Sequence, residues 1–507
     1  MARSSRWGRW RVVIGTSCAL AAALLWFGTT DHVAVWPARN TLQYHAITRW
    51  WAWTDPPAEG VARGTGTLRG TVRGAGARPI AGARVLLTRW DGTTYGAVSG
   101  AEGDYAIHGV PAGRLAGVAG APGHGDAILG SGWQHYPTAT WWWQGRRVVV
   151  AAGAETRIDT ILPADPGPRR VAPGAGLRLG APETVACRAP IDSQAVRRQM
   201  TFDSGGRPNQ VTLLYTPLHL TPGPSPAAAP LTPNPAPSRG EGNGSPPPRA
   251  TAPPLPLGSA QSTIANRGTR ASGSSQMGDW GPGGEGVPTL LTVYPGPADG
   301  WECASVPLAA AGYAVVAAGP AYSFDLERDV DELVRLLDFA RAGRLAGADG
   351  SRVAALGGSY SALHVLRLLQ REAPAGRGVA AAVLLGAPAD LFDMRRRFEQ
   401  GTFIPPFGLD QALVALGFPD REPLRYWRYS GAYHVRRELP PTVLIHSRSD
   451  AVVPYQQSEL LAGALAQAGV WHRLHLFEGA SHYLLSEEGE TLAIYQITLD
   501  FLAERLR

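Results

Sequence analysis

The stretch Arg352-Val353-Ala354-Ala355-Leu356-Gly357-Gly358-Ser359-Tyr360-Ser361 decides the fold of this chain. Its first five residues form a short apolar run typical of a buried parallel strand, and residues 362–370 read as a helix. A serine on a sharp turn between a strand and a helix is a nucleophile elbow, which requires small residues beside the serine. Ser361 replaces the last glycine of the G-x-S-x-G pattern, and because its side chain is small we expect the turn to form. Ser359 is therefore the candidate nucleophile.

Strand-like and helical stretches alternate around this motif. An amphipathic helix is expected at 326–342, with acidic residues in its first turn and Arg341 in its last, as the helix dipole prefers. Short apolar runs of the parallel-sheet type lie at 289–294, 313–318, 352–356, 379–385, 442–446 and 473–477. This alternation predicts an α/β fold, namely a doubly wound, mostly parallel sheet of the α/β-hydrolase type, over residues 183–507.

A serine hydroxyl needs a histidine to take its proton, and the histidine needs a carboxylate to fix its tautomer. In α/β-hydrolases these residues follow the order serine, acid, histidine. Asp450 lies in the loop after the strand at 442–446, and His482 lies just after the last strand. Both should therefore reach the sheet edge that carries Ser359. His472 and His475 are poorer candidates for the base, because they lie before or within the strand itself.

The oxyanion hole should take one donor from the backbone N–H of Tyr360, the residue after the nucleophile. The region after Val293 reads Tyr294-Pro295-Gly296-Pro297, and its two prolines have no N–H to donate. The phenolic hydroxyl of Tyr294 could replace the missing backbone donors. A packing role for Tyr294 beneath the loop is the alternative.

The pattern Val293-Tyr294-Pro295-Gly296-Pro297, with Gly357-Gly358-Ser359-Tyr360 downstream, resembles the prolyl oligopeptidase family of serine peptidases, especially its dipeptidyl-peptidase branch. The resemblance covers about residues 200–507. It implies an α/β-hydrolase domain in which Tyr294 supplies the second oxyanion donor. The β-propeller of that family is absent, and no paired glutamates that would grip a peptide amino terminus are identifiable. Dipeptidyl specificity is therefore not implied.

Residues 64–165 show short apolar alternations separated by Gly, Asp and Pro, which predicts an antiparallel β-sandwich. This part of the chain resembles the carboxypeptidase regulatory-like family in the order and spacing of four short motifs. They are Gly70-Thr71-Val72, residues 79–85, Gly103-Asp104-Tyr105 and Gly109-Val110-Pro111. The resemblance implies a small prealbumin-like all-β domain without catalysis of its own. The run Trp141-Trp142-Trp143 could bind a ligand, although packing is the favoured interpretation.

Two segments interrupt the catalytic domain. Residues 219–286 are rich in Pro, Gly and Ser, too poor in apolar area to offset chain entropy, and are predicted to be a disordered insertion between two strands of one sheet. The segment 391–439 is interpreted as a cap that shapes the substrate pocket, with solvated arginines. Its prominent residues are Arg395, Arg396, Arg397, Phe403, Phe407, Trp427 and Tyr433.

The N-terminus has the pattern of an export signal or a membrane anchor. Four arginines within the first 11 residues precede an apolar run over 12–28, and no clean cleavage site follows it. We expect a signal anchor within residues 1–30 that holds the protein in the membrane with its bulk outside the cytoplasm. A cleaved signal peptide, and thus a secreted protein, is the alternative.

The composition of the chain bears on whether it binds nucleic acid, a metal or a cofactor. All 47 basic residues are arginine against 41 acidic residues, and no arginine run interleaved with aromatics predicts nucleic-acid binding. Three cysteines are too few for a disulfide scaffold or a cysteine metal site. Cys187 and Cys303 could pair outside the cytoplasm, although two buried free thiols are the favoured interpretation. No metal or organic cofactor is implied.

Together these patterns predict a serine hydrolase that cleaves peptide or ester bonds through an acyl-enzyme. A carboxylesterase is the alternative enzyme, because the catalytic chemistry is the same and only the pocket differs. From another class, a catalytically dead scaffold could use the sandwich to adhere to a surface polymer. The sequence leaves the substrate and the oligomeric state open.

Overall fold

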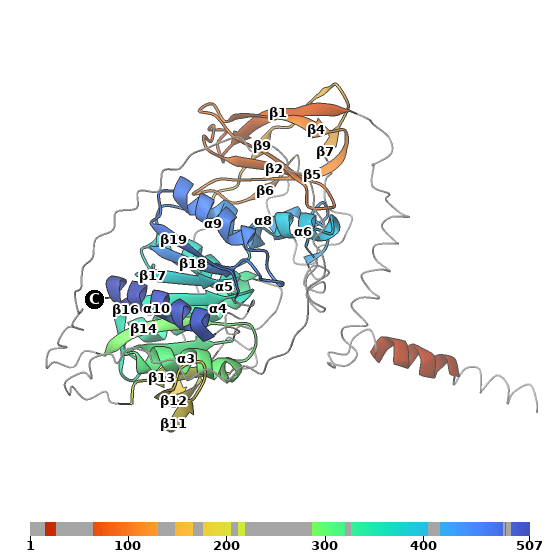
Figure 1. The fold of residues 1–507 in the computed structure, drawn as a ribbon. Coiled ribbons are helices and arrows are strands. Elements are labelled where there is room, and N and C mark those ends of the chain that lie inside the picture. The colour runs from red at the N-terminus through yellow and green to blue at the C-terminus, as the bar shows by residue number, and fades with distance from the viewer. Residues whose placement is uncertain are drawn as a thin grey trace, which may run out of the picture. The chain divides into compact units, whose positions relative to one another are not determined.

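The fold comes from a computed structural model, which describes residues 16–26, 64–129, 148–165, 176–203, 211–218, 286–319, 326–403, 416–479, 482 and 488–506 (Figure 1). Almost all of the predicted insertion at 219–286 falls outside these ranges. So do the Trp141-Trp142-Trp143 run and Phe407.

A ten-stranded sheet forms the predicted α/β domain. Its order is β10-β12-β13-β15-β14-β16-β17-β18-β19, with β11 paired to β12. The strands from β14 to β19 are parallel, and β13 pairs antiparallel with β15. The bounds are β10 Arg178–Leu179, β11 Glu183–Cys187, β12 Ser193–Thr201, β13 Thr212–Thr216, β14 Val287–Val293, β15 Ala314–Ala318, β16 Ala348–Gly358, β17 Ala381–Leu385, β18 Thr442–Ser447 and β19 His472–Phe477. This arrangement confirms the predicted α/β-hydrolase architecture.

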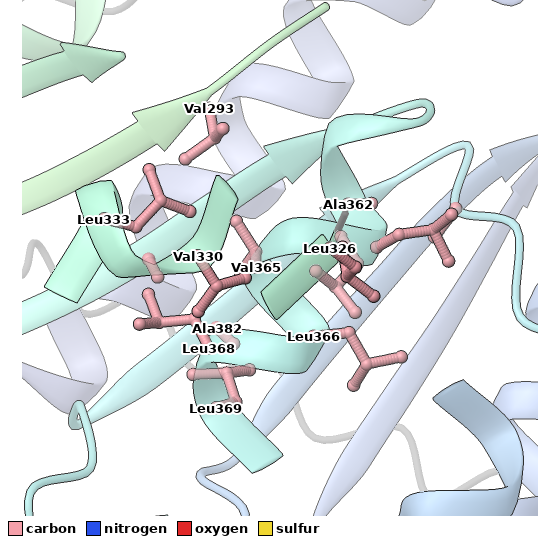
Figure 2. Packing of buried hydrophobic residues seen from close by; sticks show 14 of the residues in the cluster. Val293, Leu326, Val330, Leu333, Ala362, Val365, Leu366, Leu368, Leu369 and Ala382 are labelled. Atoms are coloured by element: carbon pink, nitrogen blue, oxygen red, sulfur yellow. The ribbon is translucent and has the colours of Figure 1, made fainter. Parts of the chain in front are cut away.

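Helices cover both faces of this sheet, as a doubly wound fold requires. Helices α4, α5 and α9 contribute to the apolar cluster on one face (Figure 2), and α3 and α10 to the cluster on the other. Neighbouring strand residues such as Val443 and Leu444 enter opposite clusters, which is why the strands are almost continuously apolar. The bounds are α3 Glu302–Ala310, α4 Leu326–Arg341, α5 Ser361–Glu372, α6 Leu391–Glu399, α8 Pro423–Tyr429, α9 Gln456–Gln467 and α10 Glu488–Arg505.

The N-terminal domain consists of two sheets around one apolar cluster. One sheet has the order β4-β1-β8 with β9 beside β1, and the other has the order β3-β2-β5-β6 with β7 beside β5. The predicted all-β domain is confirmed, and most of its strand pairs are antiparallel as predicted, but β1 pairs in parallel with both β8 and β9. These last two strands are only three and two residues long, and alternation of apolar residues indicates which face a strand buries, not the direction in which it pairs. The bounds are β1 Thr65–Arg73, β2 Arg84–Thr88, β3 Thr94–Val98, β4 Asp104–Pro111, β5 Gly113–Gly120, β6 Ala127–Ile128, β7 Val148–Val150, β8 Glu155–Arg157 and β9 Thr160–Ile161.

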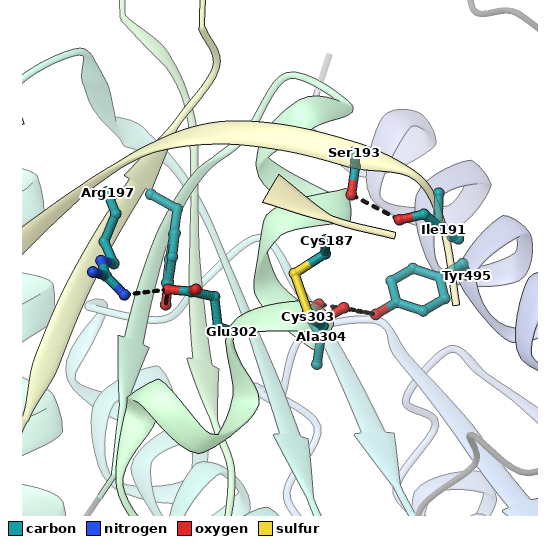
Figure 3. The surroundings of a disulfide bond; sticks show 9 residues. Cys187, Ile191, Ser193, Arg197, Glu302, Cys303, Ala304 and Tyr495 are labelled. Carbon is teal, nitrogen blue, oxygen red and sulfur yellow. Dashed lines mark hydrogen bonds and ion pairs between the residues drawn. A yellow bond between two sulfur atoms is a disulfide. The ribbon is translucent and has the colours of Figure 1, made fainter. Parts of the chain in front are cut away.

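A disulfide joins Cys187 at the end of β11 to Cys303 in α3 (Figure 3). The two cysteines are 116 positions apart in sequence, but the fold brings their Cα atoms to 5.4 Å, within the usual bridging distance. The favoured interpretation of two buried free thiols is therefore wrong. Sequence spacing could not reveal the contact, because it depends on how the β11–β12 hairpin packs against α3.

The segment predicted as a cap contains α6, α8 and the 3₁₀ helix η3 Gly431–His434. Arg395 in α6 contradicts the prediction of solvated arginines, because its side chain is completely buried and pairs with Glu399. Its guanidinium lies over the ring of Phe418 at 4.4 Å from the ring centre, a favourable cation–π contact. Arg396 and Arg397 both pair with Asp393.

Residues 16–26 form a helix whose apolar side chains, including Leu24 and Trp26, are exposed. Across the described parts of the chain, no helix is both long and apolar enough to cross a bilayer. The membrane anchor and the location outside the cytoplasm stay predictions.

Candidate active site

Ser359 stands on a tight turn between β16 and α5. Its backbone has φ of +54°, a left-handed conformation that non-glycine residues rarely adopt, and its N–H donates to the carbonyl of Leu385 at 2.8 Å. The turn is crowded on both sides. A Cβ on Gly357 would lie 2.9 Å from the Cα of Ala362, and one on Gly358 would lie 2.8 Å from the Tyr294 ring. Glycine is therefore required at both positions, and strain at Ser359 is the mark of a nucleophile elbow.

Ser361 occupies the position at which the sequence departs from G-x-S-x-G. It is the first residue of α5 and is completely buried. Its Oγ has no hydrogen-bond partner within the described residues. The strand and helix thus pack closely around a serine at this position, as the small size of its side chain led us to expect.

The structure brings Ser359, His482 and Asp450 together, although 32 positions separate the last two and 123 separate the first two. The Oγ of Ser359 is 2.6 Å from Nε2 of His482, and Nδ1 of His482 is 2.7 Å from Oδ2 of Asp450. The three residues meet because β16, β18 and β19 are parallel, so the loops after their carboxyl ends share one edge of the sheet.

The Asp450 carboxylate contacts four nitrogen atoms, two of the backbone and two of imidazole rings. Its Oδ1 accepts hydrogen bonds from the backbone of Val452 and Val453 at 2.7 and 2.8 Å, and its Oδ2 faces the imidazoles of His482 and His446. Burial alone would raise the pKa of Asp450, but the hydrogen bonds from His446, His482 and Val453 outweigh it and hold that pKa well below its usual range. Asp450 is therefore ionised at neutral pH and can orient His482.

Tyr294 follows β14 at the same sheet edge. Its ring lies against Gly358, beside Ser359, and stacks on Trp301 with ring centres 4.9 Å apart. Trp301 is held in turn by a hydrogen bond from its Nε1 to the Pro295 carbonyl at 2.6 Å. Burial raises the pKa of Tyr294, so its hydroxyl stays protonated at neutral pH and is available as a donor.

Sequence reasoning missed two residues that the structure adds to this site. His446 reaches Asp450 from within β18, and Trp301 positions the ring of Tyr294. A histidine near the end of a fully buried strand, four positions before the candidate acid, was the available signal for His446. The other two histidines weighed as bases, His472 and His475, lie on β19, and no hydrogen bond of either to Ser359 is among the contacts of the described residues.

The mostly parallel sheet, the strained turn at Ser359, and the contacts from Ser359 to His482 and from His482 to Asp450 define a class of protein. It is the class of α/β-hydrolases with a serine nucleophile motif. Residues 326–507 match the model of the prolyl oligopeptidase family. Residues 67–163 match the model of the carboxypeptidase regulatory-like domain. The chain thus carries a hydrolase domain of the first family and an N-terminal domain of the second, which confirms both resemblances.

No curated relative matches the chain at a significant level. Similar solved structures include a truncated carbohydrate esterase from gut microbiota, at 17% identity and TM-score 0.36, covering 44% of this chain and 87% of the other. Esterase B from Lactobacillus Rhamnosis is 17% identical with TM-score 0.36, covering 44% and 78%. A thermophilic esterase from Thermogutta terrifontis is 22% identical with TM-score 0.33, covering 45% and 84%. At these values the likeness carries no information on substrate.

Proposed function

We propose that this protein is a serine hydrolase that cleaves peptide or ester bonds through an acyl-enzyme. The observation that carries the proposal is the line of contacts from Ser359 Oγ to His482 Nε2 at 2.6 Å and from His482 Nδ1 to Asp450 Oδ2 at 2.7 Å. A general base within hydrogen-bond distance of a hydroxyl, with its own tautomer fixed by a carboxylate, is the arrangement that activates a serine. The prolyl oligopeptidase match supports a peptide or related acyl substrate.

In the proposed mechanism, Ser359 Oγ attacks the substrate carbonyl carbon while His482 Nε2 takes the serine proton. Asp450 stabilises the imidazolium that forms. The tetrahedral intermediate then collapses, His482 gives the proton to the leaving amine or alcohol, and the acyl group stays on Ser359. Water enters next, loses a proton to His482 and attacks the acyl carbon, and His482 returns that proton to Ser359 as the acid product leaves.

A fluorophosphonate probe tests this function directly, because it phosphonylates only an activated serine. We expect the folded wild-type protein to be labelled at Ser359 and the Ser359→Ala variant to remain unlabelled, with peptide mapping by mass spectrometry as the measurement. Ser361→Ala is the matched control, since it removes a neighbouring hydroxyl without touching the nucleophile, and it should still be labelled. An unlabelled wild type would favour a scaffold with a dead hydrolase domain, whereas labelling that persists in Ser359→Ala would show that Ser359 is not the nucleophile.

The bond type is decided by a second comparison, which uses the active enzyme without the fluorophosphonate label. Aminoacyl amides and short acyl esters should be offered at matched concentrations, and their kcat/KM values compared. Turnover of the amides identifies a peptidase, whereas turnover of the esters alone identifies a carboxylesterase.

We further propose that the oxyanion hole consists of the Tyr360 backbone N–H and the Tyr294 hydroxyl. Tyr294→Phe should then lower kcat by about a hundredfold or more and leave KM nearly unchanged, because the donor acts only as charge develops. Steady-state kinetics on the better substrate measure this effect. Tyr215→Phe is the matched control, because this buried tyrosine donates to Glu302 at 3.1 Å, away from Ser359. A wild-type rate in Tyr294→Phe would assign the donor to the backbone, for example to Gly296.

A further inference from the structure

A second histidine, His446, contacts the carboxylate of Asp450. His446 is the penultimate residue of β18 and is completely buried. Its Nε2 is 3.1 Å from Asp450 Oδ2 and 2.9 Å from the Val453 carbonyl, and its Nδ1 is 2.7 Å from Oγ of Ser458 in α9. Ser458 is completely buried as well. Every polar atom of the His446 ring therefore has a partner.

These contacts fix which ring nitrogen carries the proton in the neutral imidazole. Nε2 faces two acceptors, a carboxylate oxygen and a carbonyl oxygen, and neither of them can donate. Nε2 must therefore be the donor. Nδ1 is then an acceptor, and the Ser458 hydroxyl donates to it. The side chains therefore form one continuous series of hydrogen-bond contacts with a serine at each end. In order, its members are Ser458, His446, Asp450, His482 and Ser359.

We propose that His446 is a positioning residue for the proposed hydrolase reaction, acting through Asp450 on His482. This inference rests on the proposed function only for the assignment of His482 as the base. Asp450 Oδ2 is shared by the two imidazoles, so the donor from His446 helps to hold in place the oxygen that His482 contacts. His446 also bonds the Val453 carbonyl, and the N–H of Val453 donates to Asp450 Oδ1. One ring thus fixes both the carboxylate and the turn that holds it.

The charge on Asp450 supports the same role. The hydrogen bond from His446 is the largest of the contributions that lower the pKa of Asp450 against the effect of burial. An ionised and immobile carboxylate is what His482 needs to keep its proton on Nδ1 and its lone pair on Nε2 toward Ser359. A purely structural role would require only that the buried space be filled and the polar atoms be satisfied.

Two substitutions separate these roles. His446→Leu fills the space but has no donor, whereas His446→Gln places an amide N–H near the position of Nε2. Losing one hydrogen bond to a buried charged group corresponds to roughly a 10- to 100-fold loss. We therefore expect His446→Leu to lower kcat by that factor with KM within about twofold. His446→Gln should recover most of the rate. His472→Leu is the matched control on the neighbouring strand and should keep the wild-type rate, because within the described part of the chain its Nδ1 bonds the nearby Val470 carbonyl at 2.9 Å.

The rate constant for fluorophosphonate labelling gives the same comparison without a known substrate. A second readout is the downfield proton NMR signal of the N–H between His482 and Asp450, which reports that hydrogen bond whether or not the protein turns over. We expect the signal to move or broaden in His446→Leu and to stay in place in His446→Gln and His472→Leu. Should His446→Leu fail to fold, Ser458→Ala keeps the ring and removes only the group that Nδ1 accepts from, and it should shift the same signal.

Several results would overturn the inference. One is a wild-type labelling rate in His446→Leu with an unmoved downfield signal, and another is an equal loss in His446→Gln and His446→Leu, which would mean that shape rather than the donor matters. An unmoved signal in a folded Ser458→Ala would contradict it too. An unlabelled wild type would instead overturn the proposed function, and the NMR comparison would still decide whether His446 positions Asp450.

Discussion

Replacing His482 by alanine should lower kcat by about a millionfold, and adding Ser359→Ala to that variant should lower it no further. The reason is that His482 Nε2, 2.6 Å from Ser359 Oγ, is placed as the general base for that hydroxyl. Without the base the serine remains protonated and unreactive, so its later removal costs nothing. The remaining activity would come from substrate binding and the oxyanion donors alone. Single-turnover and steady-state rates of the two single variants and the double variant measure the effect.

His475→Ala is the control for this experiment. His475 lies on β19, only a few residues before His482 in the chain, and its ring is half-buried. The loss of the His475 ring should leave kcat within about twofold of the wild type, because substitutions away from a buried network or a functional site usually have small effects. Losses that multiply in the double variant would contradict the mechanism, because they would show Ser359 and His482 acting independently.

The sequence was sufficient for the parts of this protein that follow from short, local patterns. The run before Gly357 is continuously apolar because both faces of β16 are buried at that end. Only Gly357 and Gly358 separate the run from Ser359. Parallel strands place their carboxyl ends at one edge, so strand order alone brought Asp450 and His482 to Ser359. The predicted helix at 326–342 matches α4 to within one residue, because its apolar face and charged ends are both visible in the sequence.

The features that sequence reasoning missed depend on contacts between distant segments. Cys187 and Cys303 pair because an edge hairpin packs on α3, and no spacing rule encodes that packing. Arg395 is buried because Glu399 neutralises it and Phe418 covers its guanidinium, whereas its place in a run of three arginines indicated a solvated surface. His446 stands four positions before the candidate acid in the sequence, but its contacts with Asp450 and the Val453 carbonyl form only when the turn after β18 folds back over it.

Asp450→Asn should lower kcat by about ten-thousandfold while leaving the fold intact. The contacts around Asp450 dictate how the new amide would sit. Oδ1 accepts from the backbone N–H groups of Val452 and Val453, so the amide oxygen must take that position, since an NH₂ group there would face two donors. The NH₂ group is then left at the position of Oδ2, facing Nδ1 of His482 and Nε2 of His446, and the His446 N–H keeps the Val453 carbonyl as its acceptor.

A donor at that position reverses the tautomer of His482. Nδ1 must accept from the amide, so the ring proton moves to Nε2 and points at Ser359 Oγ, and a protonated Nε2 cannot take the serine proton. Nitrogen-15 chemical shifts of His482 would report the reversal, and kcat the loss. Asp349→Asn is the matched control, because its carboxylate also accepts a backbone N–H, from Ser351 at 2.8 Å, but bonds no histidine in the described structure. Activity of Asp450→Asn within tenfold of the wild type would mean that another group orients His482. An unchanged His482 tautomer would show that the backbone of Val452 and Val453 does not dictate the amide orientation.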